Sequence, residues 1–131
     1  MDLIKEYGSF WARNPENIRE YRELVRSKAS GVYVLYSGSA PVYVGKGHVK
    51  TRVTKRDRGG SKSPYWDHFS WFLVDNSNIE HELEALLLKV LPFYLRSLNK
   101  QTAHFRGAKK REDHHPQTCL KLPKSLSALN R

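Results

Sequence analysis

The chain has 131 residues, which is enough for a single domain with a modest hydrophobic core. Its hydrophobic content of 39% and aromatic content of 11% are ordinary for a globular protein and exclude a wholly disordered chain. The formal net charge of +10 favours a polyanionic partner. No apolar run approaches the roughly 20 residues that cross a membrane, so we expect no membrane partner. The first residues do not read as a signal peptide, and the single cysteine, Cys119, cannot form an internal disulfide, so we expect a reducing, cytoplasmic location.

The N-terminal part, residues 1–30, is predicted to be an extension with one helix. Residues 1–12 are apolar enough to pack somewhere on the domain. Asn14 can cap a helix that begins at Pro15 and runs to about residue 28. Helical spacing predicts that one stripe of this helix faces inward: Ile18, Tyr21, Leu24 and Val25. We interpret the helix as a cover for the sheet. The alternative is a DNA-contacting role for its arginines: Arg13, Arg19, Arg22 or Arg26.

Two runs of alternating β-forming residues predict a β-hairpin with strands at 31–36 and 41–45. The alternation places Tyr33 and Tyr43 close together on one face. The opposite face is then covered by the remaining residues of the two runs: Val32, Val34, Tyr36, Val42 and Val44. We expect the second strand to end at Gly45-Lys46-Gly47, where the backbone can turn sharply.

The segments after the hairpin complete a small α/β (α+β) domain. A short helix is predicted at 48–56, with Val49 and Val53 facing inward, and a third strand at 68–74. A last helix is predicted at 79–98, ended or kinked by a proline at position 92. Its inward residues are expected to be apolar: Leu83, Leu86, Leu87 and Val90. The predicted architecture is therefore a three-stranded antiparallel sheet flanked by helices, followed by a basic C-terminal appendage, 102–131, of the same domain.

An ordered set of motifs gives this pattern a specific meaning. Gly31-Val32-Tyr33 is followed after nine residues by Tyr43-Val44-Gly45, then by Lys46, by a glutamate ahead of an apolar helical run, and by a late Leu-Asn. Over residues 31–101 the chain resembles the GIY-YIG nucleases, with valine in place of isoleucine in both triplets. The resemblance implies a GIY-YIG nuclease-like fold and a metal-dependent endonuclease that hydrolyses DNA phosphodiester bonds.

The resemblance also implies the residues of the active site: Tyr33, Tyr43, Lys46, Arg52, Glu84 and Asn99. Glu84 would bind a divalent metal, Mg²⁺ or Mn²⁺, and Glu80, one helical turn away, could share its face. Either tyrosine would position or activate water, with Lys46 lowering the pKa of the phenol. Arg52 would stabilise the charge on the phosphate, with Arg56 as the alternative because the family's arginine often stands one position later. Asn99 would help to hold the site together.

Cations in and around the predicted short helix are expected to contact nucleic acid: Lys46, His48, Lys50, Lys55, Arg56, Arg58 and Lys62. The expected partner is duplex or branched DNA, although charge alone does not distinguish DNA from RNA, and a homodimer is possible. The alternatives are a non-catalytic nucleic-acid-binding module and an RNA-associated basic protein. A zinc site at His114, His115 and Cys119 is disfavoured, because adjacent histidines do not easily point at one ion.

Overall fold

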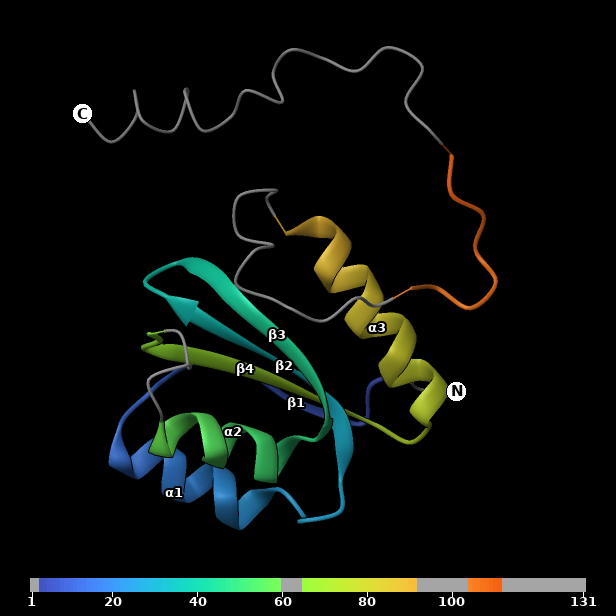
Figure 1. Ribbon diagram of the computed structural model, residues 1–131. Coiled ribbons are helices and arrows are strands. Elements are labelled where there is room, and N and C mark those ends of the chain that lie inside the picture. Colours follow the sequence, from blue (N-terminus) through green and yellow to red (C-terminus); the bar gives the residue numbers. More distant parts are fainter. Residues whose placement is uncertain (1–2, 60–64, 92–103, 112–131) are drawn as a thin grey trace, which may run out of the picture.

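The computed structural model describes residues 3–59, 65–91 and 104–111 (Figure 1). Within them the elements follow one another as β1 (Glu6–Ala12), α1 (Pro15–Leu24), β2 (Ser30–Ser37), β3 (Ala40–His48), α2 (Val49–Arg58), β4 (His68–Val74) and α3 (Ser77–Val90). The strands form one antiparallel sheet in the order β1-β4-β2-β3. In Figure 1, α1 and α2 lie on one side of this sheet and α3 on the other. None of the helices in this part of the chain has the length and apolar character needed to cross a membrane.

The predicted α+β class with an antiparallel sheet is confirmed, but the sheet has four strands instead of three. The additional strand, β1, comes from the N-terminal segment and pairs with β4. Its register shifts between Gly8 and Trp11, and Phe10 in this bulge has a positive φ of 56°. The bulge breaks the period-two pattern by which a strand is recognised in sequence.

The larger part of the core lies between the sheet and the pair α1 and α2. The predicted inward residues of these helices, Tyr21, Val25, Val49 and Val53, are all buried there. Leu24 is not, since 46% of it is exposed. The helix α1 also ends at Leu24, four residues before the predicted end, because the next residue already has extended backbone angles. Asn14 caps α1 as predicted, with its side chain accepting a hydrogen bond from the N–H of residue 17.

A smaller core lies between the sheet and α3, where Val34 and Val44 pack against Ala85 and Leu88. The predicted inward stripe of this helix is wrong at two positions, since Leu86 is 49% exposed and the valine at position 90 is 66% exposed, whereas the predicted Leu87 does pack against this core. The stripe that faces the sheet contains Glu84, Ala85 and Leu88. Because a glutamate and an alanine are less apolar than leucine, the apolar periodicity predicts that the neighbouring leucines face inward. α3 ends at residue 90, and the predicted continuation to residue 98 lies outside the described residues.

The hairpin of β2 and β3 forms as predicted, but β3 is longer. It continues through Gly45-Lys46-Gly47 to His48, and Gly47 pairs with Gly31. A bulge lies opposite Leu35 and Tyr36, and it moves Val42 onto the face that carries the two tyrosines. The predicted end of the strand at Gly45 and the predicted position of Val42 are therefore both wrong. β3 is an edge strand, and α2 begins directly where it ends.

Candidate active site at the edge of the sheet

The two glycines of the motif are explained by close packing. A Cβ atom on Gly31 would lie 2.0 Å from the carbonyl oxygen of Phe72 in β4, so glycine permits the close approach of β2 and β4. A Cβ atom on Gly45 would lie 2.5 Å from both Oη and Cζ of Tyr33. The absence of a side chain at Gly45 therefore lets the Tyr33 phenol pass across β3, the edge strand of the sheet.

A first group of predicted site residues comprises the two tyrosines and Arg56. The rings of Tyr33 and Tyr43 are stacked with centroids 6.0 Å apart, which confirms that they are neighbours on one face. Arg56 donates from Nη2 to Oη of Tyr43 at 2.5 Å, and its guanidinium carbon lies 4.2 Å from the centre of that ring. Arg56, the alternative to Arg52, is thus the arginine in contact with the tyrosine pair.

The electrostatic environment keeps Tyr33 protonated. Burial, with a smaller contribution from the nearby Tyr43, raises the pKa of Tyr33 to about 12, although Arg56 acts in the opposite direction. The neutral phenol is a hydrogen-bond donor near neutral pH. This environment favours a role for Tyr33 in positioning a phosphate or a water over a role as a base.

A second group forms around Lys46, which projects from β3 toward α3. Its Nζ lies 2.9 Å from Nδ1 of His81 and 3.9 Å from Oε1 of Glu84. An ammonium group only donates hydrogen bonds, so Nδ1 of His81 accepts. The other ring nitrogen, Nε2, lies 2.6 Å from the carbonyl oxygen of His104 and therefore carries the proton. These two contacts hold the ring of His81 between Lys46 at one end and the backbone of residue 104 at the other.

His81 is not among the site residues predicted from the sequence. The signal that could have found it is its spacing, because it stands three residues before Glu84 and thus on a neighbouring helical position. Its contact with Lys46 joins residues 35 positions apart.

Two carboxylates of α3 share this region. Glu84 is only 4% exposed, and burial raises its pKa, while Lys46 and His81 lower it and Glu80 raises it. Burial also raises the pKa of Glu80, against the opposing effect of Lys46 and His48. One oxygen of Glu80, Oε2, is buried and has no hydrogen-bond partner among the residues that the structure describes. The two carboxylates, one turn apart, therefore lie where their negative charge is poorly compensated.

The donor atoms fit a hard divalent cation. Magnesium is commonly held by one or two carboxylates, with waters and substrate phosphates completing its shell, and Glu84 and Glu80 supply such a pair. Within residues 3–59, 65–91 and 104–111, no group of three or more His, Cys, Asp and Glu side chains is arranged to hold a metal ion. The residues of the alternative zinc site, 114, 115 and 119, lie outside the described residues.

The two groups lie on opposite faces at the edge of the sheet. Side chains alternate along a strand, so Lys46 shares the α3 face with Val44, whereas Tyr43 belongs to the core on the α2 face. Arg52 is exposed and lies over Gly47, where a Cβ atom would be 3.5 Å from its Nε. The structure thus brings Lys46 together with Glu84, and the tyrosines together with Arg56, around the end of β3. The predicted residues Asn99 and Lys62 lie outside the described residues.

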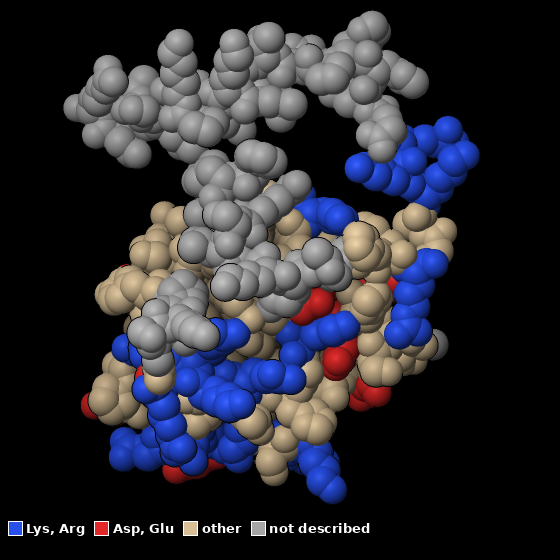
Figure 2. Space-filling view, in the orientation of Figure 1, with Lys and Arg blue, Asp and Glu red and all other residues tan. Residues whose placement is uncertain are grey.

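The predicted nucleic-acid contacts on α2 are accessible. His48, Lys55 and Arg58 are exposed and Lys50 is half-buried. In the view of Figure 2, Lys and Arg side chains gather over α1 and α2, and acidic side chains gather beside α3. Comparisons of the chain with known protein families, with curated proteins and with solved structures find no match. A functional interpretation therefore depends on the residues and their arrangement.

Proposed function

We propose that the protein is a metal-dependent endonuclease that hydrolyses DNA phosphodiester bonds through a GIY-YIG-type site at the edge formed by β3, α2 and α3. The observation that carries the proposal is the buried Glu84, which faces Lys46 from α3. Burying a carboxylate that is only loosely paired disfavours the folded state, so such a residue beside a cationic surface is a candidate for function.

The residues on the α2 side suit the handling of a phosphate. The guanidinium of Arg56, fixed by its contact with Tyr43, offers further donors to a phosphate oxygen. Arg52, in α2, is exposed and lies over Gly47 near the end of β3, and it can stabilise the charge that develops in the transition state. Tyr33, as a neutral phenol, would donate a hydrogen bond to the phosphate or to the attacking water.

The residues on the α3 side suit a divalent cation. Glu84, with Glu80, would hold Mg²⁺ or Mn²⁺, and His81 would orient Lys46 beside the carboxylates. A bound divalent metal polarises the phosphate and favours deprotonation of water. In the net reaction, the water oxygen bonds to phosphorus, the bond to the leaving sugar oxygen breaks, and that oxygen takes up a proton. The expected substrate is duplex or branched DNA.

The test is cleavage of supercoiled plasmid with Mg²⁺, with Mn²⁺ and with a chelator, using the native protein and Glu84→Gln. We expect cleavage that depends on metal and falls by about 10²-fold or more in the variant, because an electrostatic contact to the reacting group is lost. Glu82→Gln is the matched control: it removes the same charge from the same helix, and its amide oxygen can still accept from the N–H of Arg106. Full activity in Glu84→Gln, or cleavage unaffected by chelator, would refute the proposal.

A second candidate is a nucleic-acid-binding module without catalysis. It is favoured by the ammonium of Lys46, which lies 3.9 Å from Glu84 and already supplies part of the missing positive charge. This alternative predicts tight, salt-sensitive binding with no cleavage of plasmid, branched DNA or RNA under any metal condition. Cleavage abolished by chelator would exclude it.

A further inference from the structure

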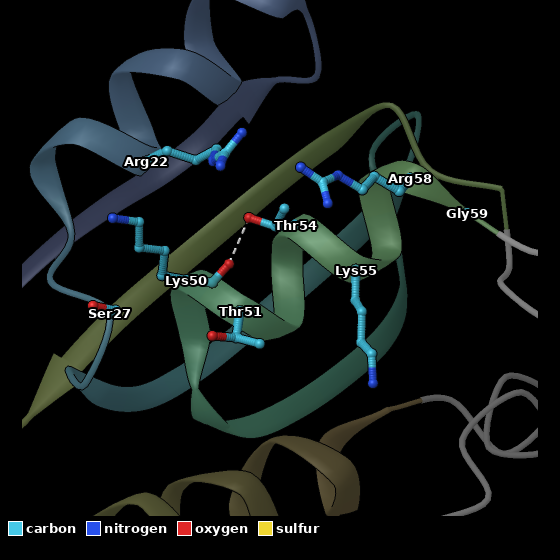
Figure 3. A pocket seen from close by; sticks show the side chains of 8 residues that line it. All are labelled: Arg22, Ser27, Lys50, Thr51, Thr54, Lys55, Arg58 and Gly59. Carbon is cyan, nitrogen blue, oxygen red and sulfur yellow. Dashed lines mark hydrogen bonds between the residues drawn. The ribbon is translucent and has the colours of Figure 1, made fainter.

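A cationic groove lies between α1 and α2, at a distance from the candidate active site. One hollow of about 420 Å³ is lined by side chains of both helices and their ends: Arg22, Ser27, Lys50, Thr51, Thr54, Lys55, Arg58 and Gly59. A second hollow of about 470 Å³ shares Arg22 and Lys50 with the first and extends along α1. Figure 3 shows Arg22 of α1 and Arg58 of α2 extending toward each other across the groove, while Lys50 reaches toward α1 and Lys55 points away.

Positive side chains outnumber acidic ones in this groove. Among the described residues, no acidic side chain lines the first hollow, and Glu23 lines the second. In the part of the chain that the structure describes, neither Arg22, Lys50 nor Arg58 takes part in an ion pair. Like charges gathered in one hollow repel one another, and a bound anion removes that repulsion. The groove is therefore suited to an anionic ligand, and its two guanidinium groups present paired donors that match the oxygens of a phosphate.

The periodicity of α2 relates this groove to the candidate active site. Lys50, Thr54 and Arg58 recur every four residues and form the flank of α2 that faces α1. Arg52 and Arg56 lie on the opposite flank, where Arg56 contacts the tyrosine pair. An α-helix with its side chains is about 10–12 Å across. That width corresponds to about three nucleotides of one strand at the 3.4 Å rise of duplex DNA.

We propose that the groove between α1 and α2 binds a backbone phosphate of the nucleic acid, about three nucleotides from the candidate cleavage site, so that the strand crosses α2. Most of the lining side chains are exposed, so the groove is open to solvent and a polymer can pass through it. Arg22 lies outside the segment that resembles a nuclease, which gives the N-terminal helix a part in binding. The inference depends on the nucleic-acid-binding part of the proposed function and is independent of cleavage.

The test is a salt titration of duplex binding by Arg22→Gln, with Arg58→Gln as a second variant. Loss of one phosphate contact lowers the slope of log K against log salt concentration by about one. We expect that decrease for a long duplex with each variant. With Arg22→Gln we expect no change in this slope for a short duplex that covers the candidate cleavage site alone. Both arginines are exposed, so glutamine should not disturb the fold.

Arg26→Gln is the matched control, since Arg26 is an exposed arginine just beyond α1 that lines a different hollow. It removes the same charge and should leave the slope unchanged. An equal decrease of the slope with Arg26→Gln would overturn the inference. So would an equal decrease for long and short duplexes with Arg22→Gln. Either result would mean a general effect of charge. A native protein that binds no nucleic acid would overturn it together with the binding part of the proposed function. A native protein that binds without cutting refutes cleavage alone, and the titration then still decides the role of the groove.

Discussion

The packing of Tyr33 across Gly45 leads to a prediction with a magnitude. In Gly45→Ala, the new Cβ would lie 2.5 Å from Oη and Cζ of the phenol and 2.7 Å from Cε1. Ordinary contact begins at about 3.4 Å, so the ring must move from 2.5 to 3.4 Å, or by about 0.9 Å. Tyr33 is buried and stacked on Tyr43, so there is little room for this movement. Overpacking of this kind typically costs about 1–3 kcal/mol of unfolding free energy.

The assay is a double-mutant cycle measured by denaturant unfolding. Tyr33→Leu lacks the three atoms that the alanine would meet, so Gly45→Ala should cost less in that background, with a coupling of about 1–2 kcal/mol. Gly107→Ala is the control, because in the described part of the chain nothing lies within 4 Å of its Cβ, and we expect almost no change. An equal cost of Gly45→Ala in both backgrounds would refute the reasoning. The displaced phenol should also lower cleavage by the Gly45→Ala protein, even under conditions where it remains folded.

Three further substitutions test the candidate site. Burial raises the pKa of Glu84, so the folded protein holds this proton more tightly than the unfolded one, and the contribution of Glu84 to stability falls as pH rises above the ordinary glutamate range. Glu84→Gln should therefore be more stable than the native protein at pH 7, and denaturant unfolding at several pH values should show the difference shrinking toward acid. His81→Ala should lower cleavage about 10–100-fold by releasing Lys46, and His81→Asn, whose side-chain oxygen can accept from Lys46, should restore part of it; equal loss in both variants would contradict this positioning role. Arg56→Lys keeps the charge but loses the planar contact with Tyr43, so steady-state cleavage rates should fall about tenfold or more, and unchanged rates would contradict the role of the guanidinium.

Local sequence pattern predicted the parts of the fold in which local preference and packing agree. The hairpin, the neighbouring positions of Tyr33 and Tyr43, and the inward Val49 and Val53 all follow from alternation or helical spacing. These patterns work because each residue faces the side that its own chemistry prefers. The same agreement holds at Asn14, whose side chain caps α1.

The features that the sequence could not reveal depend on contacts between distant residues or on a violated local preference. β1 was missed because its bulge at Phe10 interrupts the alternation. The inward stripe of α3 was misplaced because it includes the buried Glu84. His81 stands at helical spacing from Glu84, but its contact with Lys46 joins residues 35 positions apart. Arg22 likewise meets the cations of α2 only in the folded chain.

The arrangements that oppose folding in this molecule point to one class of ligand. Glu84 is buried and Glu80 is half-buried one helical turn away, and one oxygen of Glu80 lacks a hydrogen-bond partner among the described residues. On the other flank of the molecule, Arg22 and Arg58 line a hollow in which, among the described residues, no acidic side chain is present. A divalent cation would relieve the first arrangement and a phosphate would relieve the second. A polynucleotide that carries a metal ion supplies both, which is why we favour a nuclease over an explanation that treats either cluster as a feature of the fold alone.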